Sequence, residues 1–178
     1  MLTLVIGEPN SGKSEFAESL IASYAGPTAY IGTLPDLHMF DKRIQRHRLR
    51  RPSSWDLVEL VGNPHVDTRL ISSAMDQYQN ILLDGLAFYV LQLLSVFEFE
   101  PSEFAKHIRE LAKDFSRHPG KVVVVDQPVT HIRCEKTVEA VQGLHLILAR
   151  QADEIQLISE SLSTTIQACH LLELDRHR

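Results

Sequence analysis

The sequence predicts an α/β protein with a doubly wound, mostly parallel sheet flanked by helices. Short apolar runs alternate along the chain with longer stretches in which apolar residues recur at helical spacing. Glycine and proline residues mark the turns between these segments. With 178 residues, 44% of them hydrophobic and 23% charged, the chain suits one compact unit. We therefore expect a single domain spanning residues 1–178.

The apolar runs predict the strands. Their Val, Ile and Leu residues occupy consecutive positions, which is typical of parallel strands buried on both faces. A weaker strand pattern covers Trp55–Leu60, and Leu171–Leu174 is a candidate for a last edge strand. The main strands are expected at Leu2–Ile6, Thr28–Gly32, Ile81–Asp84, Val122–Asp126 and Glu154–Ile158.

The segments with helical spacing predict the flanking helices. In the first of them, Phe16, Leu20 and Ile21 share one face. Loops such as His118-Pro119-Gly120 separate helices from the strands that follow. The helices are expected at Lys13–Tyr24, Met39–Arg50, Val66–Gln79, Leu86–Phe97, Ser102–Arg117 and Thr137–Ala152.

The most specific motif is a phosphate-binding loop that matches the pattern G-x-x-x-x-G-K-[ST]. Its residues are Gly7, Glu8, Pro9, Asn10, Ser11, Gly12, Lys13 and Ser14. The loop lies between the first strand and the first helix, where backbone N–H groups and the helix dipole bind phosphates. Lys13 is expected to reach the β- and γ-phosphates, and the Ser14 hydroxyl to bind Mg²⁺. The sequence thus predicts a P-loop NTPase-like fold with a nucleoside triphosphate at the carboxyl ends of the strands.

Two apolar strands end in an aspartate that suits a metal site. In P-loop proteins such a strand supplies the carboxylate that holds Mg²⁺. Asp84 follows Ile81-Leu82-Leu83, and Asp126 follows the valine run 122–125. Either residue fits this role from the sequence alone.

A run of positive charge, here called the basic segment, covers residues 42–52 and contains His47. On a helix, Arg43, His47 and Arg51 share a face. A solvated basic surface is one interpretation; nucleic-acid binding is disfavoured by the lack of interleaved aromatic residues and the net charge of −5. After a phosphate-binding loop, arginines also suit phosphate oxygens, and a neutral imidazole can attack a phosphorus atom.

The sequence also indicates the cellular compartment of the protein. Cys134 and Cys169 suggest no disulfide framework, and the chain begins with a strand rather than a basic, apolar secretory signal. The apolar stretch 86–96 is too short to cross a bilayer. We therefore expect a cytoplasmic protein that neither spans a membrane nor binds nucleic acid.

These features, in this order, resemble the bifunctional adenosylcobinamide kinase and adenosylcobinamide-phosphate guanylyltransferase family. The resemblance rests on the phosphate-binding loop, the run R-I-x-x-H-R-x-R-R-P followed by Trp55 and Glu59, and the strand ending at Asp84. Ala152-Asp153-Glu154 before a late strand also matches. The resemblance implies GTP- or ATP-dependent phosphorylation of adenosylcobinamide. Guanylyl transfer to adenosylcobinamide phosphate would follow, through a histidine-bound GMP.

The resemblance also implies the site residues. The catalytic residues would be His47, which would carry the GMP, and Lys13, and the metal ligands would be Ser14 and Asp84 with Mg²⁺. A homo-oligomer is implied as well. The residues that would bind GTP or ATP are Gly7, Glu8, Pro9, Asn10, Ser11, Gly12, Lys13, Ser14, Gly32, Thr33, Leu34, Arg48, Leu49, Arg50, Arg51, Glu59 and Asp84.

The chain departs from the family pattern in two places. Glu8, Pro9 and Asn10 replace the usual loop residues, and residues 126–134 replace a glycine-rich segment after the fifth strand. Two alternatives therefore stay open: a P-loop small-molecule kinase without the transfer step, and a non-catalytic nucleotide-binding regulatory module. The absence of an N-K-x-D motif leaves GTP and ATP undecided.

Overall fold

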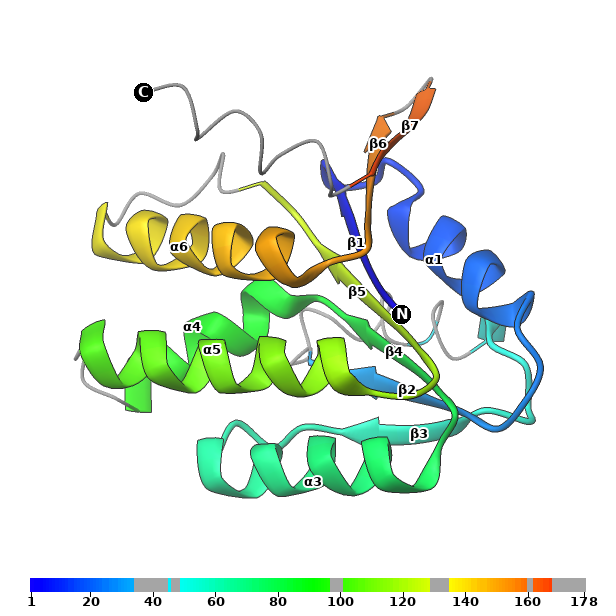
Figure 1. Ribbon diagram of the computed structural model, residues 1–178, viewed down its shortest axis with the longest axis horizontal. Coiled ribbons are helices and arrows are strands. Elements are labelled where there is room, and N and C mark those ends of the chain that lie inside the picture. Colours follow the sequence, from blue (N-terminus) through cyan, green and yellow to red (C-terminus); the bar gives the residue numbers. More distant parts are fainter. Residues whose placement is uncertain (34–44, 46–48, 97–100, 129–134, 160–161, 168–178) are drawn as a thin grey trace.

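The computed structural model describes residues 1–33, 45, 49–96, 101–128, 135–159 and 162–167. Within these residues the chain forms one seven-stranded sheet with the strand order β3-β2-β4-β5-β1-β6-β7 (Figure 1). The strands are β1 (Leu2–Gly7), β2 (Thr28–Gly32), β3 (Asp56–Glu59), β4 (Asn80–Asp84), β5 (Lys121–Asp126), β6 (Glu154–Ser159) and β7 (Leu162–Gln167). All neighbouring strands pair in parallel except β6 and β7, which are antiparallel.

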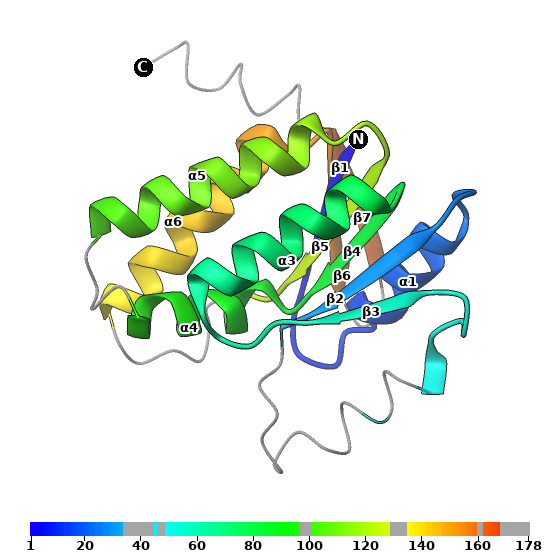
Figure 2. The ribbon, with the colours of Figure 1, turned by 90° about the horizontal axis from the view of Figure 1, so that it is seen from below.

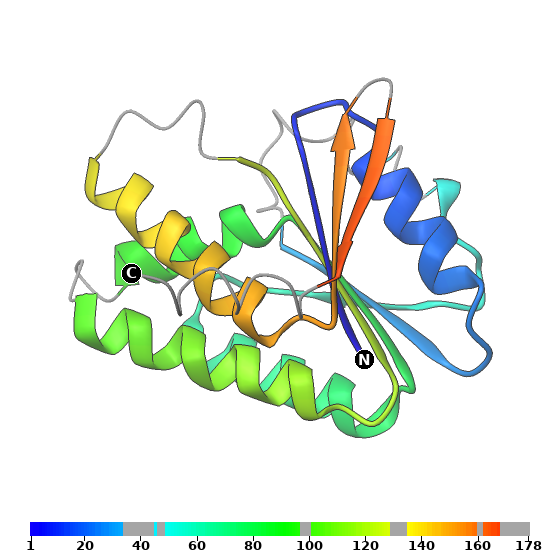
Figure 3. The ribbon, with the colours of Figure 1, turned by 45° about the horizontal axis from the view of Figure 1, so that its top comes forward.

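Helices cover both faces of this sheet, as the sequence predicts for a doubly wound fold (Figures 2 and 3). Helix α1 lies on one face, and α3, α4, α5 and α6 lie on the other. None of the described helices is both long and apolar enough to cross a membrane. The helices are α1 (Lys13–Ala22), α3 (Pro64–Gln77), α4 (Leu86–Val96), α5 (Pro101–Arg117) and α6 (Glu135–Gln151).

The alternation of side chains along the strands divides the core into two parts. Val122 and Val124 pack in the larger cluster, beneath α3 to α6, whereas Val123 and Val125 pack in the smaller cluster, beneath α1. All four side chains are fully buried. Because burying one valine stabilises a fold by about 1.5–3 kcal/mol, a continuous valine run contributes to both faces of a parallel strand.

The observed elements differ from the predicted ones mainly at their ends. Helix α3 begins at Pro64, before the predicted start at Val66, because the Asn63 side chain accepts hydrogen bonds from the first N–H groups and proline suits the first turn. The weak strand pattern at residues 55–60 is confirmed as β3. The predicted helix Met39–Arg50 lies mostly outside the described residues, although positions 45, 49 and 50 are helical.

Strand β7 was not predicted. Its sequence, Leu-Ser-Thr-Thr-Ile-Gln, is short and polar and gives no apolar run. It forms because β6 offers a free edge, on which Ile166 lies opposite Ile155 in an antiparallel register. The other edge-strand candidate, Leu171–Leu174, lies outside the described residues.

Parallel pairing brings the carboxyl ends of β1, β2, β3 and β4 to the same edge of the sheet. Gly32 of β2 lies in register with Glu59 on one side and with Asp84 on the other. Strand β5 separates β4 from β1, and its Val125 lies opposite both Asp84 and Val5. The end of β4 therefore lies one strand away from the loop that follows β1.

Candidate nucleotide-binding site

The phosphate-binding loop connects β1 to α1 through backbone angles that suit few residue types. Asn10 and Gly12 have positive φ angles of 64° and 85°. At Gly7 a Cβ atom would lie 2.6 Å from the carbonyl oxygen of Ile158 on β6, so the close approach of the two strands requires glycine. A Cβ at Gly12 would meet nothing within 4 Å. The loop is thus tight against β6 and open in front of α1.

The amino end of α1 has the properties of an anion site. Gly12 is its N-cap and offers no side-chain acceptor to the first N–H groups of the helix. Lys13 is buried, and its Nζ donates a hydrogen bond to the Glu8 carbonyl oxygen at 3.1 Å, which holds the ammonium group over the loop. The Ser11 hydroxyl is buried and has no hydrogen-bond partner among the described residues. Positive charge and unsatisfied donors therefore converge where phosphate oxygens would bind.

Asp84 lies beside the loop at the end of β4. The Ser14 hydroxyl donates to its Oδ1 at 3.3 Å, and the Tyr30 hydroxyl donates to its Oδ2 at 2.7 Å. Both Ser14 and Asp84 are buried. A hydroxyl and a carboxylate this close fit Mg²⁺, which takes a few oxygen ligands from the protein and the others from phosphates and water. The donor set therefore fits the metal that the sequence predicts.

Asp126, the other candidate for the metal carboxylate, serves the opposite face of the sheet. Its Oδ1 accepts hydrogen bonds from the backbone N–H groups of Ala87 at 2.9 Å and Gln127 at 2.8 Å. Its Oδ2 lies 2.6 Å from Nε2 of His145 on α6. These contacts cap the start of α4 and connect it to α6, so the geometry favours Asp84 for the metal.

An Asp126→Ala variant is expected to lose stability and to retain nucleotide binding. Removing the carboxylate leaves the buried Ala87 N–H without its acceptor, which costs about 1–3 kcal/mol. Chemical denaturation measures this loss, and Asp126→Asn, which keeps one acceptor oxygen, is the control. A variant with wild-type stability and impaired Mg²⁺-dependent nucleotide binding would instead make Asp126 the metal carboxylate.

Tyr30 belongs to the candidate site although no sequence motif marks it. It lies on β2, facing α1, and is 3% exposed. Burial, and next the negative charge of Asp84, raise the pKa of Tyr30 well above its usual value. The phenol therefore keeps its proton and acts as the donor to Asp84. The guanidinium carbon of Arg51 lies 3.3 Å from the centroid of the Tyr30 ring.

The remaining predicted residues at this edge have different roles. The Thr33 hydroxyl lies 3.0 Å from the carbonyl oxygen of Asp84 and 2.5 Å from that of Gly85, so it supports the turn into α4. Gly32 ends β2 between Asp84 and Glu59, and Glu59 is exposed on edge strand β3. The loop residues Glu8, Pro9 and Asn10 are also exposed.

The structure connects the end of the basic segment to α1. Arg50 Nε and Nη2 donate to the Glu18 carboxylate at 2.8 and 3.0 Å, and Nη1 donates to Glu15. The Arg50 side chain therefore contacts carboxylates of α1, whereas Leu49 is 88% exposed. The other predicted residues, His47, Arg48 and Leu34, lie outside the described residues.

The sequence has relatives over nearly its whole length. Residues 3–166 match the family model described as cobinamide kinase / cobinamide phosphate guanyltransferase. The bifunctional adenosylcobalamin biosynthesis protein CobU of Salmonella typhimurium is 31% identical over 94% of this chain and 100% of that protein. The bifunctional adenosylcobalamin biosynthesis protein CobP of Pseudomonas aeruginosa is 29% identical over 70% of each chain.

Among solved structures, a prototypical ATPase from the type III secretion system of pathogenic bacteria superposes with a TM-score of 0.59 at 10% sequence identity. The match covers 99% of this chain and 53% of the ATPase, so the chain spans about half the length of that protein. At this identity the likeness concerns the fold alone, and it supports the P-loop NTPase-like architecture described above.

Proposed function

The chain belongs to the cobinamide kinase / cobinamide phosphate guanyltransferase family and is therefore a transferase, and from this premise we propose that it carries out both reactions at one nucleotide site. In the first reaction a γ-phosphate passes to the aminopropanol hydroxyl of adenosylcobinamide. In the second, GMP passes to adenosylcobinamide phosphate. The observation that carries the proposal is the contact between Ser14 and Asp84 beside the phosphate-binding loop.

The phosphorylation step uses the loop and its surroundings. Backbone N–H groups at the start of α1 would bind the β- and γ-phosphates, and the Lys13 ammonium would stabilise the charge that develops during transfer. Ser14 and Asp84 would hold Mg²⁺, which when bound neutralises charge on the same phosphate oxygens. The hydroxyl oxygen of the acceptor forms the new bond to the γ-phosphorus and releases its proton, and the nucleoside diphosphate leaves.

The guanylyl step uses His47. A neutral imidazole nitrogen would attack the α-phosphorus of GTP, forming a P–N bond and releasing pyrophosphate. A phosphate oxygen of adenosylcobinamide phosphate would then attack the same phosphorus, break the P–N bond and free the histidine. Arg48 and Arg51 suit the negative charge that develops in both transfers. We further propose that the protein forms a homo-oligomer and that GTP or ATP donates the γ-phosphate in the first step.

The test of the kinase reaction is transfer of label from the γ-phosphate. The protein is incubated with adenosylcobinamide, Mg²⁺ and either GTP or ATP labelled at the γ-phosphorus, and the corrinoid fraction is counted. We expect Mg²⁺-dependent label in that fraction with at least one nucleotide. Saturable nucleotide binding without label in the corrinoid would support the non-catalytic regulatory module instead.

A further inference from the structure

We propose that Tyr30 is a positioning residue that connects the two reactions, because its hydroxyl orients Asp84 while its ring holds Arg51 at the end of the basic segment. The inference rests on the proposed function, since it concerns how the metal carboxylate and the histidine-bearing segment are held relative to one another. Tyr30 itself lies beneath these groups in the smaller core cluster and is 3% exposed.

The hydroxyl of Tyr30 fixes the orientation of the Asp84 carboxylate. It donates to Oδ2 at 2.7 Å, while the other oxygen, Oδ1, lies 3.3 Å from the Ser14 hydroxyl. The carboxylate thus has one oxygen directed toward Tyr30 and the other toward the residue that the loop motif assigns to Mg²⁺. A partner behind a ligand of this kind orients it and tunes its affinity for the metal.

The ring of Tyr30 contacts Arg51, near the end of the basic segment. The guanidinium carbon of Arg51 lies 3.3 Å from the ring centroid, within the range of a cation–π interaction. Arg51 Nε is buried and has no hydrogen-bond partner among the described residues. The face of the Tyr30 ring thus provides a specific contact for the Arg51 guanidinium group. Arg51 follows His47 within the basic segment.

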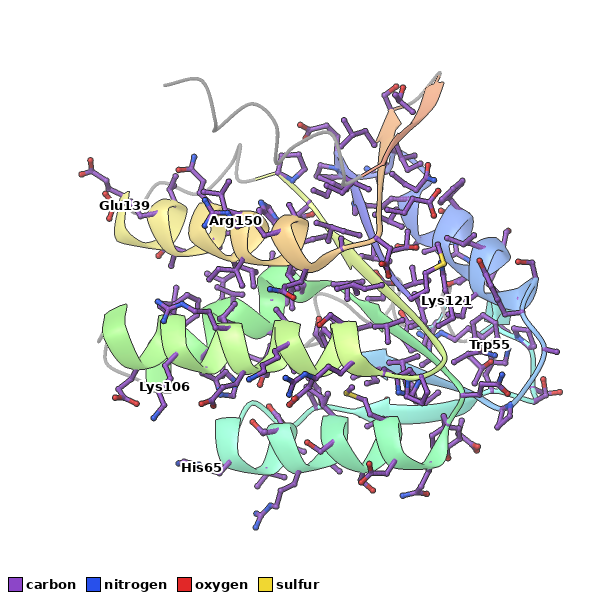
Figure 4. All side chains as sticks on the ribbon, viewed as in Figure 1. Trp55, His65, Lys106, Lys121, Glu139 and Arg150 are labelled. Atoms are coloured by element: carbon purple, nitrogen blue, oxygen red, sulfur yellow. The ribbon has the colours of Figure 1, made fainter. Side chains whose placement is uncertain are left out.

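A second contact, between Arg50 and the α1 carboxylates, holds the same end of the segment. Trp55, which follows the basic segment and is the only tryptophan in the sequence, packs against the cluster that contains Tyr30 (Figure 4). Its fluorescence therefore reports on the packing of this cluster and of the chain that follows the basic segment.

Two substitutions separate the two functions of Tyr30. Tyr30→Phe keeps the ring and removes the hydroxyl, so we expect the Mg²⁺ concentration for half-maximal phosphorylation to rise by about 10- to 100-fold. At saturating Mg²⁺, labelling of the protein by α-labelled GTP and the Trp55 fluorescence should match those of the wild type. Tyr30→Leu also removes the ring, so labelling at saturating Mg²⁺ should slow by about 2- to 30-fold and the Trp55 emission should shift.

Metal binding is also measured without turnover. Calorimetric titration of a non-hydrolysable GTP analogue at increasing Mg²⁺ should show the same weakened metal dependence in Tyr30→Phe. Circular dichroism and thermal unfolding establish that each variant is folded, and Tyr30→Met replaces the leucine variant should that variant not fold.

Two results would overturn the inference. An unchanged Mg²⁺ dependence in Tyr30→Phe excludes the role of the hydroxyl, and equal labelling rates in the phenylalanine and leucine variants exclude the role of the ring. If the wild-type protein phosphorylates nothing and takes no label, the proposed function fails. In that case the analogue titration still decides whether Tyr30 orients the metal carboxylate.

Discussion

A Lys13→Ala variant is expected to lose phosphoryl transfer to adenosylcobinamide by about 10²–10³-fold while it stays folded. The Lys13 side chain is buried, and its ammonium group is held over the phosphate-binding loop by the Glu8 carbonyl oxygen. No other cation of the loop can replace it, because Lys13 is the single Lys or Arg between residues 7 and 14. The rate of γ-phosphate transfer at saturating nucleotide measures the effect.

The structure offers a control lysine at the amino ends of the strands, opposite the end at which the loop lies. Lys121 is also buried, and its Nζ donates to the Thr3 hydroxyl at 2.7 Å near the amino ends of β1 and β5 (Figure 4). Lys121→Met therefore removes a buried lysine far along the strands from the loop, and it should change stability more than turnover. A Lys13→Ala variant that keeps its turnover within a factor of about 3 would show that this loop does not bind the reacting phosphates.

A His47→Ala variant is expected to lose covalent labelling by α-labelled GTP by more than about 10³-fold, since the proposed nucleophile is gone. Phosphorylation of adenosylcobinamide should continue, because the loop, Lys13 and Asp84 are intact. The label on the wild-type protein should be labile to acid and stable to alkali, as a phosphoramidate is. Gel separation of the protein after denaturation, with counting of the bound label, measures the effect.

His65→Ala is the control for this substitution. His65 is an exposed histidine on α3, on the face of the sheet that α1 does not cover (Figure 4), so its loss should leave labelling unchanged. Acid-labile label that persists in His47→Ala would show that another residue is the nucleophile.

Much of the fold could be predicted because local patterns determine it. Strands such as β4 and β5 are continuous apolar runs, and a strand buried on both faces needs little else to be recognised. Strand β7 escaped prediction because its polar sequence acquires its conformation from pairing with β6. The predicted start of α3 at Val66 lies two residues late, because Asn63 caps the helix and Pro64 forms part of its first turn.

The candidate site could be predicted where its residues form a motif in sequence. The phosphate-binding loop determines Lys13 and Ser14, but the choice between Asp84 and Asp126 depends on which face of the sheet each side chain occupies. Tyr30 belongs to no motif, since it is a single aromatic residue within the short strand β2. Its only sequence signal is a phenol hydroxyl in a strand that is predicted to be buried, where such a group needs a hydrogen-bond partner.

The contacts of Arg50 and His145 depend on distant segments in the same way. Arg50 pairs with Glu18 across 32 positions of sequence, and His145 contacts Asp126 across 19. Neither pair follows a helical or strand period, so no local pattern predicts it. Both contacts depend on how segments distant in the sequence pack together in the fold.

The fate of the α-phosphate of GTP tests whether the protein carries out both reactions. The wild-type protein is incubated with adenosylcobinamide, Mg²⁺, unlabelled ATP and GTP labelled at the α-phosphorus, and the corrinoids are separated by chromatography and identified by mass spectrometry. We expect a corrinoid that carries its new phosphate and the labelled GMP, with pyrophosphate released. A product that carries the phosphate alone, with no α-label in the corrinoid or on the protein, would contradict the proposal and identify a small-molecule kinase without the transfer step.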